Sequence, residues 1–152
     1  MPFLVETEVK LSNIPNAGRG RFFCKDYEKE TIIRKQKVDS DELYIFNNEK
    51  QLELVNFDYL LNYGHSRPIE DINDNSIYLN NPPLFTNHSN VPNIYFIYNN
   101  DEKYTIASKD VKKGEELYQD YSIYKKIDWF EHFLEKNNKK SLRCFGNELN
   151  KH

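Results

Sequence analysis

A short polar segment, Phe85–Asn93 (FTNHSNVPN), holds the residue types best suited to chemistry. It places three amide side chains, one imidazole and one proline within nine residues. This pattern is too structured for a solvated loop. Amide and imidazole groups can both donate and accept hydrogen bonds. The segment therefore indicates a binding site, although a single histidine such as His88 is also common as a hydrogen-bonded core residue.

Three further segments matter because of their order along the chain. Gly18–Phe23 (GRGRFF) lies upstream, and a Gly-x-Gly pattern alone predicts only a turn. Ala107–Leu117 (ASKDVKKGEEL) and Tyr118–Tyr121 (YQDY) follow the polar segment after an intervening hairpin pattern. Taken together, the four segments are far more specific than any one of them.

The pattern Asn-His-Ser-x-x-Pro-Asn followed by Gly-Glu-Glu-Leu-x-x-Asp-Tyr resembles the SET domain of protein lysine methyltransferases, over about residues 5–125. Residues 1–152 are interpreted as one minimal, viral-type SET domain with an insert at about 39–83 and a closing helix at about 128–138. The resemblance implies a mostly β (α+β) fold of small β-sheets with a knot-like crossing. It also implies S-adenosylmethionine on one face and the target lysine on the other, joined by a narrow channel.

The implied reaction is a direct displacement in which the cofactor supplies the reactive methyl carbon. The protein must hold nitrogen, carbon and sulfur in line, about 3 Å apart. It must also accept a neutral amine, although only roughly one lysine in 2,500 is neutral at pH 7 when the pKa is about 10.4. A nearby sulfonium and an apolar channel lower that pKa. A tyrosine hydroxyl can orient the amine and hold the methyl group through weak C–H···O contacts.

By this resemblance, Tyr121 is the catalytic tyrosine, and Asn87 and His88 contact the cofactor. The alternative for Tyr121 is a buried residue that ends a strand. Two further residues, Asn93 and Asp120, are expected to be scaffold residues that tie the crossing segments together.

The upstream glycine segment is expected to approach the cofactor through its backbone, because glycine permits close contact. The alternative for its two arginine side chains is that they are simply solvated. Trp129 is a candidate for covering the adenine. The expected backbone contacts are Gly18, Arg19, Gly20 and Arg21.

Two positions are expected to line the lysine channel beside Tyr121, namely Phe96 and Gln119. A tyrosine at either position could hold a water that takes the space of further methyl groups. Phe96 lacks that hydroxyl and favours an enzyme that adds more than one methyl group. The Gln119 amide could hold a water, point away from the channel, or face solvent on an edge strand.

No metal site is expected, because Cys24 and Cys144 are isolated and the four histidines are scattered. The cysteine-rich zinc-binding tail that many histone-directed relatives carry after the last motif is absent. The two cysteines are interpreted as free thiols.

Short strands dominate the expected secondary structure. Glu49–Tyr63 has apolar residues at helical spacing, and Trp129 to about Asn137 forms a closing helix with a capping box at Asp128 and Glu131. A hairpin is expected from Ile94–Tyr98 and Tyr104–Ser108. The other expected strands are Val5–Leu11, Arg21–Cys24, Thr31–Val38, Ile77–Leu79 and Glu116–Tyr121.

A net charge of −3 indicates no basic field, so direct nucleic-acid binding is not expected. No signal peptide or membrane-spanning run is visible, which favours an intracellular protein, cytoplasmic or nuclear. The expected partner is a lysine-containing protein or peptide, either a histone or a non-histone protein. A SET-like interaction module without activity and a structural accessory protein of a virus or phage are the alternatives.

Overall fold

The structure is a computed structural model that describes residues 3–37, 43–54, 76–80, 84–99, 102–123 and 126–138. The chain divides into two compact units. Unit 1 comprises Met1–Ser40 and Leu84–Asp120, and unit 2 comprises Asp41–Pro83 and Tyr121–His152. Each unit is therefore built from two stretches of sequence.

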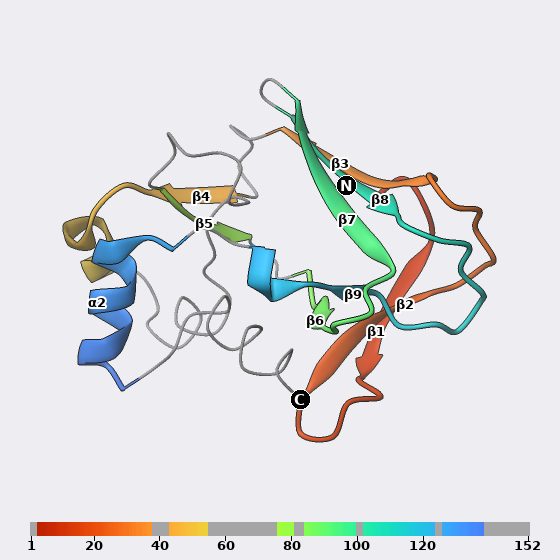
Figure 1. The fold of residues 1–152 in the computed structure, drawn as a ribbon, viewed down its shortest axis with the longest axis horizontal. Coiled ribbons are helices and arrows are strands. Elements are labelled where there is room, and N and C mark those ends of the chain that lie inside the picture. The colour runs from red at the N-terminus through yellow and green to blue at the C-terminus, as the bar shows by residue number, and fades with distance from the viewer. Residues whose placement is uncertain are drawn as a thin grey trace. The chain divides into compact units, whose positions relative to one another are not determined.

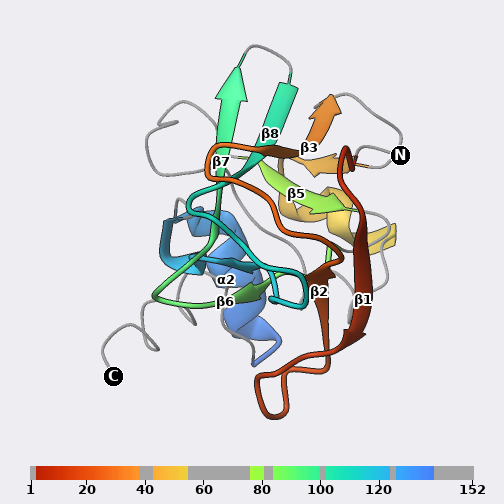
Figure 2. The ribbon, with the colours of Figure 1, turned by 90° about the vertical axis from the view of Figure 1, so that its right-hand side faces the viewer.

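Unit 1 consists of three small β-sheets (Figures 1 and 2). Strands β1 (Thr7–Leu11) and β2 (Arg19–Phe23) form an antiparallel pair. Strands β3 (Ile32–Lys37), β8 (Glu102–Ala107) and β7 (Ile94–Asn99) form an antiparallel sheet with β8 in the middle. Strands β6 (Asn87–His88) and β9 (Tyr118–Gln119) pair in parallel.

Local sequence explains these elements. The β7 sequence, Ile94–Asn99, is rich in β-branched and aromatic residues, which favour a pleated strand. The turn between β1 and β2 contains two left-handed residues, Asn16 with φ 64° and Gly18 with φ 73°. Asparagine and glycine are the residues that tolerate this conformation best. The predicted turn and hairpin are therefore confirmed, and β7 and β8 extend closer to their turn than predicted.

Unit 2 combines one small sheet with helices. Strands β4 (Leu43–Phe46) and β5 (Ile77–Asn80) are antiparallel, and β4 was not predicted. The helices are η1 (Glu49–Leu54), η2 (Tyr121–Ile123) and α2 (Asp128–Lys136). No helix in the described ranges is long and apolar enough to cross a membrane. The buried core of this unit consists of Phe46, Leu52, Ile77, Leu79, Ile127, Phe130, Phe133 and Leu134.

Three secondary-structure predictions need correction. The helix predicted from Glu49 is a 3₁₀ helix as far as Leu54, and positions 55–63 lie outside the described residues. The predicted capping box is wrong, because Ile127 occupies the N-cap and no side chain caps the helix. The last strand is shorter than predicted, since Tyr121 already belongs to the 3₁₀ helix η2.

The pairing of β6 with β9 is reinforced by one side chain. Asn93 is buried, and its Nδ2 donates to the Glu116 carbonyl oxygen at 2.8 Å while its Oδ1 accepts from the Tyr118 amide at 2.8 Å. The Asn93 and Ser89 backbone amides add hydrogen bonds to the carbonyls of β9. The Asn93 side chain thus adds two hydrogen bonds between its own segment and the residues of β9, which confirms its predicted scaffold role.

We predict that Asn93→Asp destabilises the protein by about 1–3 kcal/mol, because the substitution removes a buried donor and leaves a carbonyl oxygen facing a carboxylate. Urea unfolding followed by circular dichroism measures the change. Asn90→Asp is the control, because it makes the same change at an exposed position of the same segment. Equal midpoints for the two variants would contradict the role of Asn93.

Candidate active site

Asn87 lies where the glycine segment meets the polar segment. Its Nδ2 lies 3.0 Å from Glu116 Oε2, 3.1 Å from the Arg19 carbonyl oxygen and 3.2 Å from Ser12 Oγ. A carboxylate and a carbonyl can only accept hydrogen bonds, so the amide nitrogen must face them. Within the described residues, Oδ1 of Asn87 accepts no hydrogen bond and remains available to a ligand.

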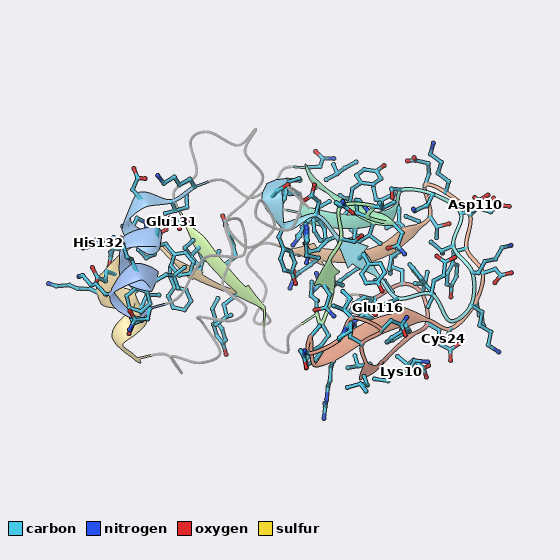
Figure 3. The ribbon with its side chains drawn as sticks, turned by 60° about the horizontal axis from the view of Figure 1, so that its bottom comes forward. Lys10, Cys24, Asp110, Glu116, Glu131 and His132 are labelled. Carbon is cyan, nitrogen blue, oxygen red and sulfur yellow. The ribbon has the colours of Figure 1, made fainter. Side chains whose placement is uncertain are left out.

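The Glu116 carboxylate is the centre of this cluster. Its side chain is fully buried, with a residue exposure of 2%. It accepts from the Ser12 hydroxyl at 2.8 and 3.0 Å, the Asn13 amide at 2.9 Å and the Tyr118 hydroxyl at 3.1 Å, in addition to Asn87. Figure 3 shows Glu116 beside the β1–β2 pair. One buried charge therefore joins β6, β9 and the β1–β2 turn.

Gly20 is required by this carboxylate. A Cβ atom at Gly20 would overlap with Glu116 Oε2 and would also crowd Asn87 Nδ2 at 3.3 Å. The sequence-based argument attributed this glycine to a close approach of the cofactor. The structure supplies a different reason, because the space above Gly20 holds the Glu116 side chain.

The two arginines of the glycine segment differ. Arg19 is exposed, and only its carbonyl oxygen takes part in the cluster. Arg21 is half-buried; its Nε donates to the Leu84 carbonyl oxygen at 2.7 Å and its Nη1 donates to Thr7 Oγ1 at 2.9 Å. Burial lowers the pKa of the Arg21 guanidinium. The alternative of a solvated side chain is therefore wrong for Arg21, which anchors the residues just before Asn87.

Tyr118 lies opposite Asn87 in the parallel pair of strands. Burial raises the pKa of the Tyr118 hydroxyl, and the nearby Glu116 carboxylate raises this pKa further. The hydroxyl consequently stays protonated at neutral pH and serves as a donor to Glu116.

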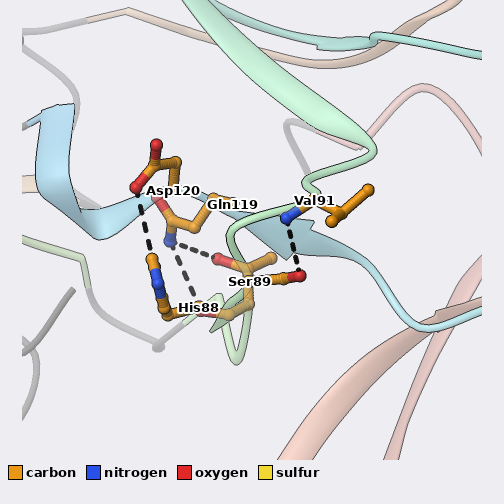
Figure 4. A network of polar contacts seen from close by, with 6 residues as sticks. His88, Ser89, Val91, Gln119 and Asp120 are labelled. Carbon is orange, nitrogen blue, oxygen red and sulfur yellow. Dashed lines mark hydrogen bonds and ion pairs between the residues drawn. The ribbon is translucent and has the colours of Figure 1, made fainter. Parts of the chain in front are cut away.

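His88 is buried beneath the end of β9. Its imidazole Nδ1 lies 3.7 Å from Asp120 Oδ1, and its side chain is 2% exposed (Figure 4). The Ser89 backbone amide donates to the Gln119 carbonyl oxygen at 2.9 Å, which holds the residue after His88 against β9. The carboxylate of Asp120 and the imidazole thus face each other across the crossing, as expected for a scaffold residue at Asp120.

Gln119 points into the protein and not toward solvent. Its Nε2 donates to Thr86 Oγ1 at 2.7 Å and approaches the Thr86 carbonyl oxygen at 3.3 Å. The residue is 6% exposed, so the alternative of a solvent-facing glutamine is wrong. The amide is held in one orientation by the residue that precedes Asn87.

Phe96, the other expected channel residue, is buried in β7. The Lys103 ammonium lies 4.3 Å from the centre of its ring, and Lys103 is itself buried. The register places Phe96 opposite Thr105 and Tyr98 opposite Lys103, so these four side chains share one face of the sheet. A buried cation therefore contacts the aromatic ring that was predicted to line the channel.

Tyr121 and Trp129 belong to unit 2. The half-buried Tyr121 opens the 3₁₀ helix η2, directly after Asp120 in the chain. Trp129 is half-buried on α2 and packs edge-on against Phe130, with ring centroids 5.9 Å apart. Phe130 and Phe133 are buried in the core of this unit.

Sequence reasoning missed Glu116, Ser12 and Lys103. Glu116 was visible as part of the Gly-Glu-Glu-Leu motif, but the charged and polar residues around it gave no signal that its carboxylate would be buried. Ser12 and Lys103 carry no signal either, because Ser12 bonds to Glu116, 104 residues away, and a lysine in a strand is usually exposed.

No group of three or more potential metal ligands occurs among the described residues. Cys24 is a free thiol, and Cys144 lies outside the described residues. That activity needs no metal stays a prediction.

The chain was compared with known families and structures. Residues 15–122 match the family model of the SET domain, a range that contains every motif described above. A search of curated protein sequences finds no match.

Solved structures share the fold at low identity. A Plasmodium falciparum protein provisionally assigned as a histone methyltransferase is 17% identical, with a TM-score of 0.50, over 75% of this chain and 90% of its own. CpSET8 from Cryptosporidium is 19% identical, with a TM-score of 0.51, over 76% of this chain and 56% of its own.

A third structure is Polycomb Repressive Complex 2 of Chaetomium thermophilum in an autoinhibited conformation bound to S-adenosylmethionine. It is 17% identical, with a TM-score of 0.58, over 88% of this chain, which spans only 17% of that much longer chain. The structural similarity supports the fold alone, and the family follows from the match over residues 15–122: the chain belongs to the SET-domain family.

Proposed function

We propose that this protein transfers a methyl group from S-adenosylmethionine to the side-chain amine of a lysine in another protein, either a histone or a non-histone protein. Membership of the SET-domain family supports the class of reaction. The observation that carries the proposal is the cluster at Asn87, which combines an available amide oxygen with a buried carboxylate.

This cluster fits the ammonium group of the cofactor. Asn87 Oδ1 suits an ammonium donor, and the negative charge of Glu116 nearby favours a cation over an anion. Gly18 and Arg19 are exposed residues beside this cluster, and the Arg19 carbonyl oxygen already bonds to Asn87. When bound, the cofactor supplies the electrophilic methyl group.

The other proposed residues act on the lysine or on the cofactor. The Tyr121 hydroxyl orients the neutral amine and accepts weak contacts from the methyl hydrogens. Phe96 and Gln119 shape the channel, and His88, whose imidazole faces Asp120, contacts the cofactor. Trp129 covers the adenine. Each of these roles is part of the proposal.

The decisive assay incubates the protein with labelled S-adenosylmethionine and a cell lysate, and then maps the labelled lysines by mass spectrometry. Transfer to lysine supports an enzyme. Cofactor binding without transfer to any protein would favour a SET-like interaction module.

For Tyr121→Phe we predict a loss of turnover of about 100-fold or more, because one polar contact that acts at the reacting centre is removed. Binding of S-adenosylhomocysteine and thermal stability should stay close to wild type. Tyr95→Phe is the matched control, since it removes an exposed hydroxyl that bonds to Glu30. Similar turnover in both variants would refute the assignment of Tyr121.

Asn87→Ala and His88→Ala are expected to weaken binding of S-adenosylhomocysteine more than they weaken the fold. Calorimetric titration measures the affinity, and thermal denaturation measures the fold. Because His88 is buried, its variant is compared with Asn87→Ala, whose site is only half-buried. Normal affinity in both variants would show that the segment has a structural role only.

The number of methyl groups added is predicted to exceed one, because Phe96 has no hydroxyl to hold a water in the channel and the Gln119 amide is held by Thr86. Mass spectrometry of the target lysine after long incubation reads out the product. Exclusively monomethylated lysine, unchanged in Gln119→Ala, would contradict this prediction.

A further inference from the structure

We propose that Glu116 is a positioning residue of the cofactor site, whose buried carboxylate fixes the Asn87 amide so that its oxygen is presented to the α-ammonium group of S-adenosylmethionine. The inference rests on the proposed function and adds to it a residue that does not itself touch the cofactor.

The orientation of the Asn87 amide follows from its partners. An asparagine amide can rotate by 180° at little cost, so something must select one face. Here Glu116 Oε2 and the Arg19 carbonyl oxygen both lie within 3.1 Å of Nδ2. Neither group can donate, and the carboxylate bond is the stronger because it is charge-assisted. Glu116 therefore selects the orientation that leaves Oδ1 available.

Glu116 itself has no freedom to move. Its Oε1 accepts from the Asn13 backbone amide, the Ser12 hydroxyl and the Tyr118 hydroxyl, while its Oε2 accepts from Ser12 and Asn87. The Gly20 backbone packs directly against the carboxylate. A charge held this tightly in a buried place can impose an orientation on its neighbour.

Glu116→Gln removes the selection while nearly preserving shape. The new amide nitrogen is disfavoured at the Oε1 position, since the Asn13 backbone amide cannot accept a hydrogen bond. At the Oε2 position the new amide nitrogen faces the Ser12 hydroxyl, which can rotate to accept a hydrogen bond. It also faces Asn87 Nδ2, which cannot accept a hydrogen bond. Asn87 must then either rotate its nitrogen outward or keep two donors face to face.

The experiment compares two ligands in wild type and in Glu116→Gln by calorimetric titration. The ligands are S-adenosylhomocysteine and its analogue in which hydrogen replaces the α-amino group. In wild type the first should bind more tightly, because only it carries the ammonium. In the variant this preference should fall by about tenfold to a hundredfold, the size of one hydrogen bond to a charged group.

A purely structural role for Glu116 would weaken both ligands by the same factor, and an unchanged preference would overturn the inference. A wild-type protein that binds neither ligand would overturn the proposed function, and the inference with it. Glu115→Gln is the control, because it makes the same charge change at the neighbouring exposed position and should leave the preference intact.

Glu116→Asp covers the case in which the glutamine variant does not fold. It keeps the charge and draws the carboxylate back from Asn87 by one methylene group. Thermal denaturation confirms folding, and the preference for the ammonium-bearing ligand should again fall. A folded Glu116→Asp protein with the wild-type preference would also overturn the inference.

Discussion

The buried carboxylate of Glu116 is the constraint around which unit 1 is organised. A charge removed from water costs several kcal/mol unless hydrogen bonds replace its hydration (about 1–3 kcal/mol for even a neutral group). Here the replacements come from the β1–β2 turn, from β6 and from β9. The charge therefore favours the convergence of these segments and couples motifs that lie up to 104 residues apart in sequence.

The two short strands β6 and β9 are stabilised by side-chain hydrogen bonds that supplement their backbone pairing. Strands β6 and β9 contain two residues each, which is too few for independent stability. Asn93 adds two hydrogen bonds to the backbone around β9, and Gln119 adds another to Thr86 just before β6. A parallel pair of this length needs such support, because its polar groups are largely buried and must be satisfied.

The sequence alone was sufficient for the family, the order of the motifs and most strand positions, because those depend on local patterns. It failed for the type of helix at Glu49–Leu54, which is 3₁₀, and for the cap at Asp128. The hydrogen-bond partners of Arg21 and Gln119 could not be predicted from the sequence either. Both side chains are long and polar, which usually means solvent exposure, and only the fold brings Leu84 and Thr86 within hydrogen-bonding distance.

In the motif Tyr118–Tyr121, side-chain contacts within unit 1 hold each of the residues that precede Tyr121. Tyr118 bonds to Glu116, Gln119 bonds to Thr86, and Asp120 faces His88, so each of the first three side chains is anchored to the core or to the polar segment. Anchoring three consecutive residues removes most of the backbone freedom of the chain that leads into Tyr121. A catalytic group gains its advantage from being held in place before the substrate arrives. The specificity of this motif is therefore mostly structural, and under the proposed function only its final hydroxyl performs the chemistry.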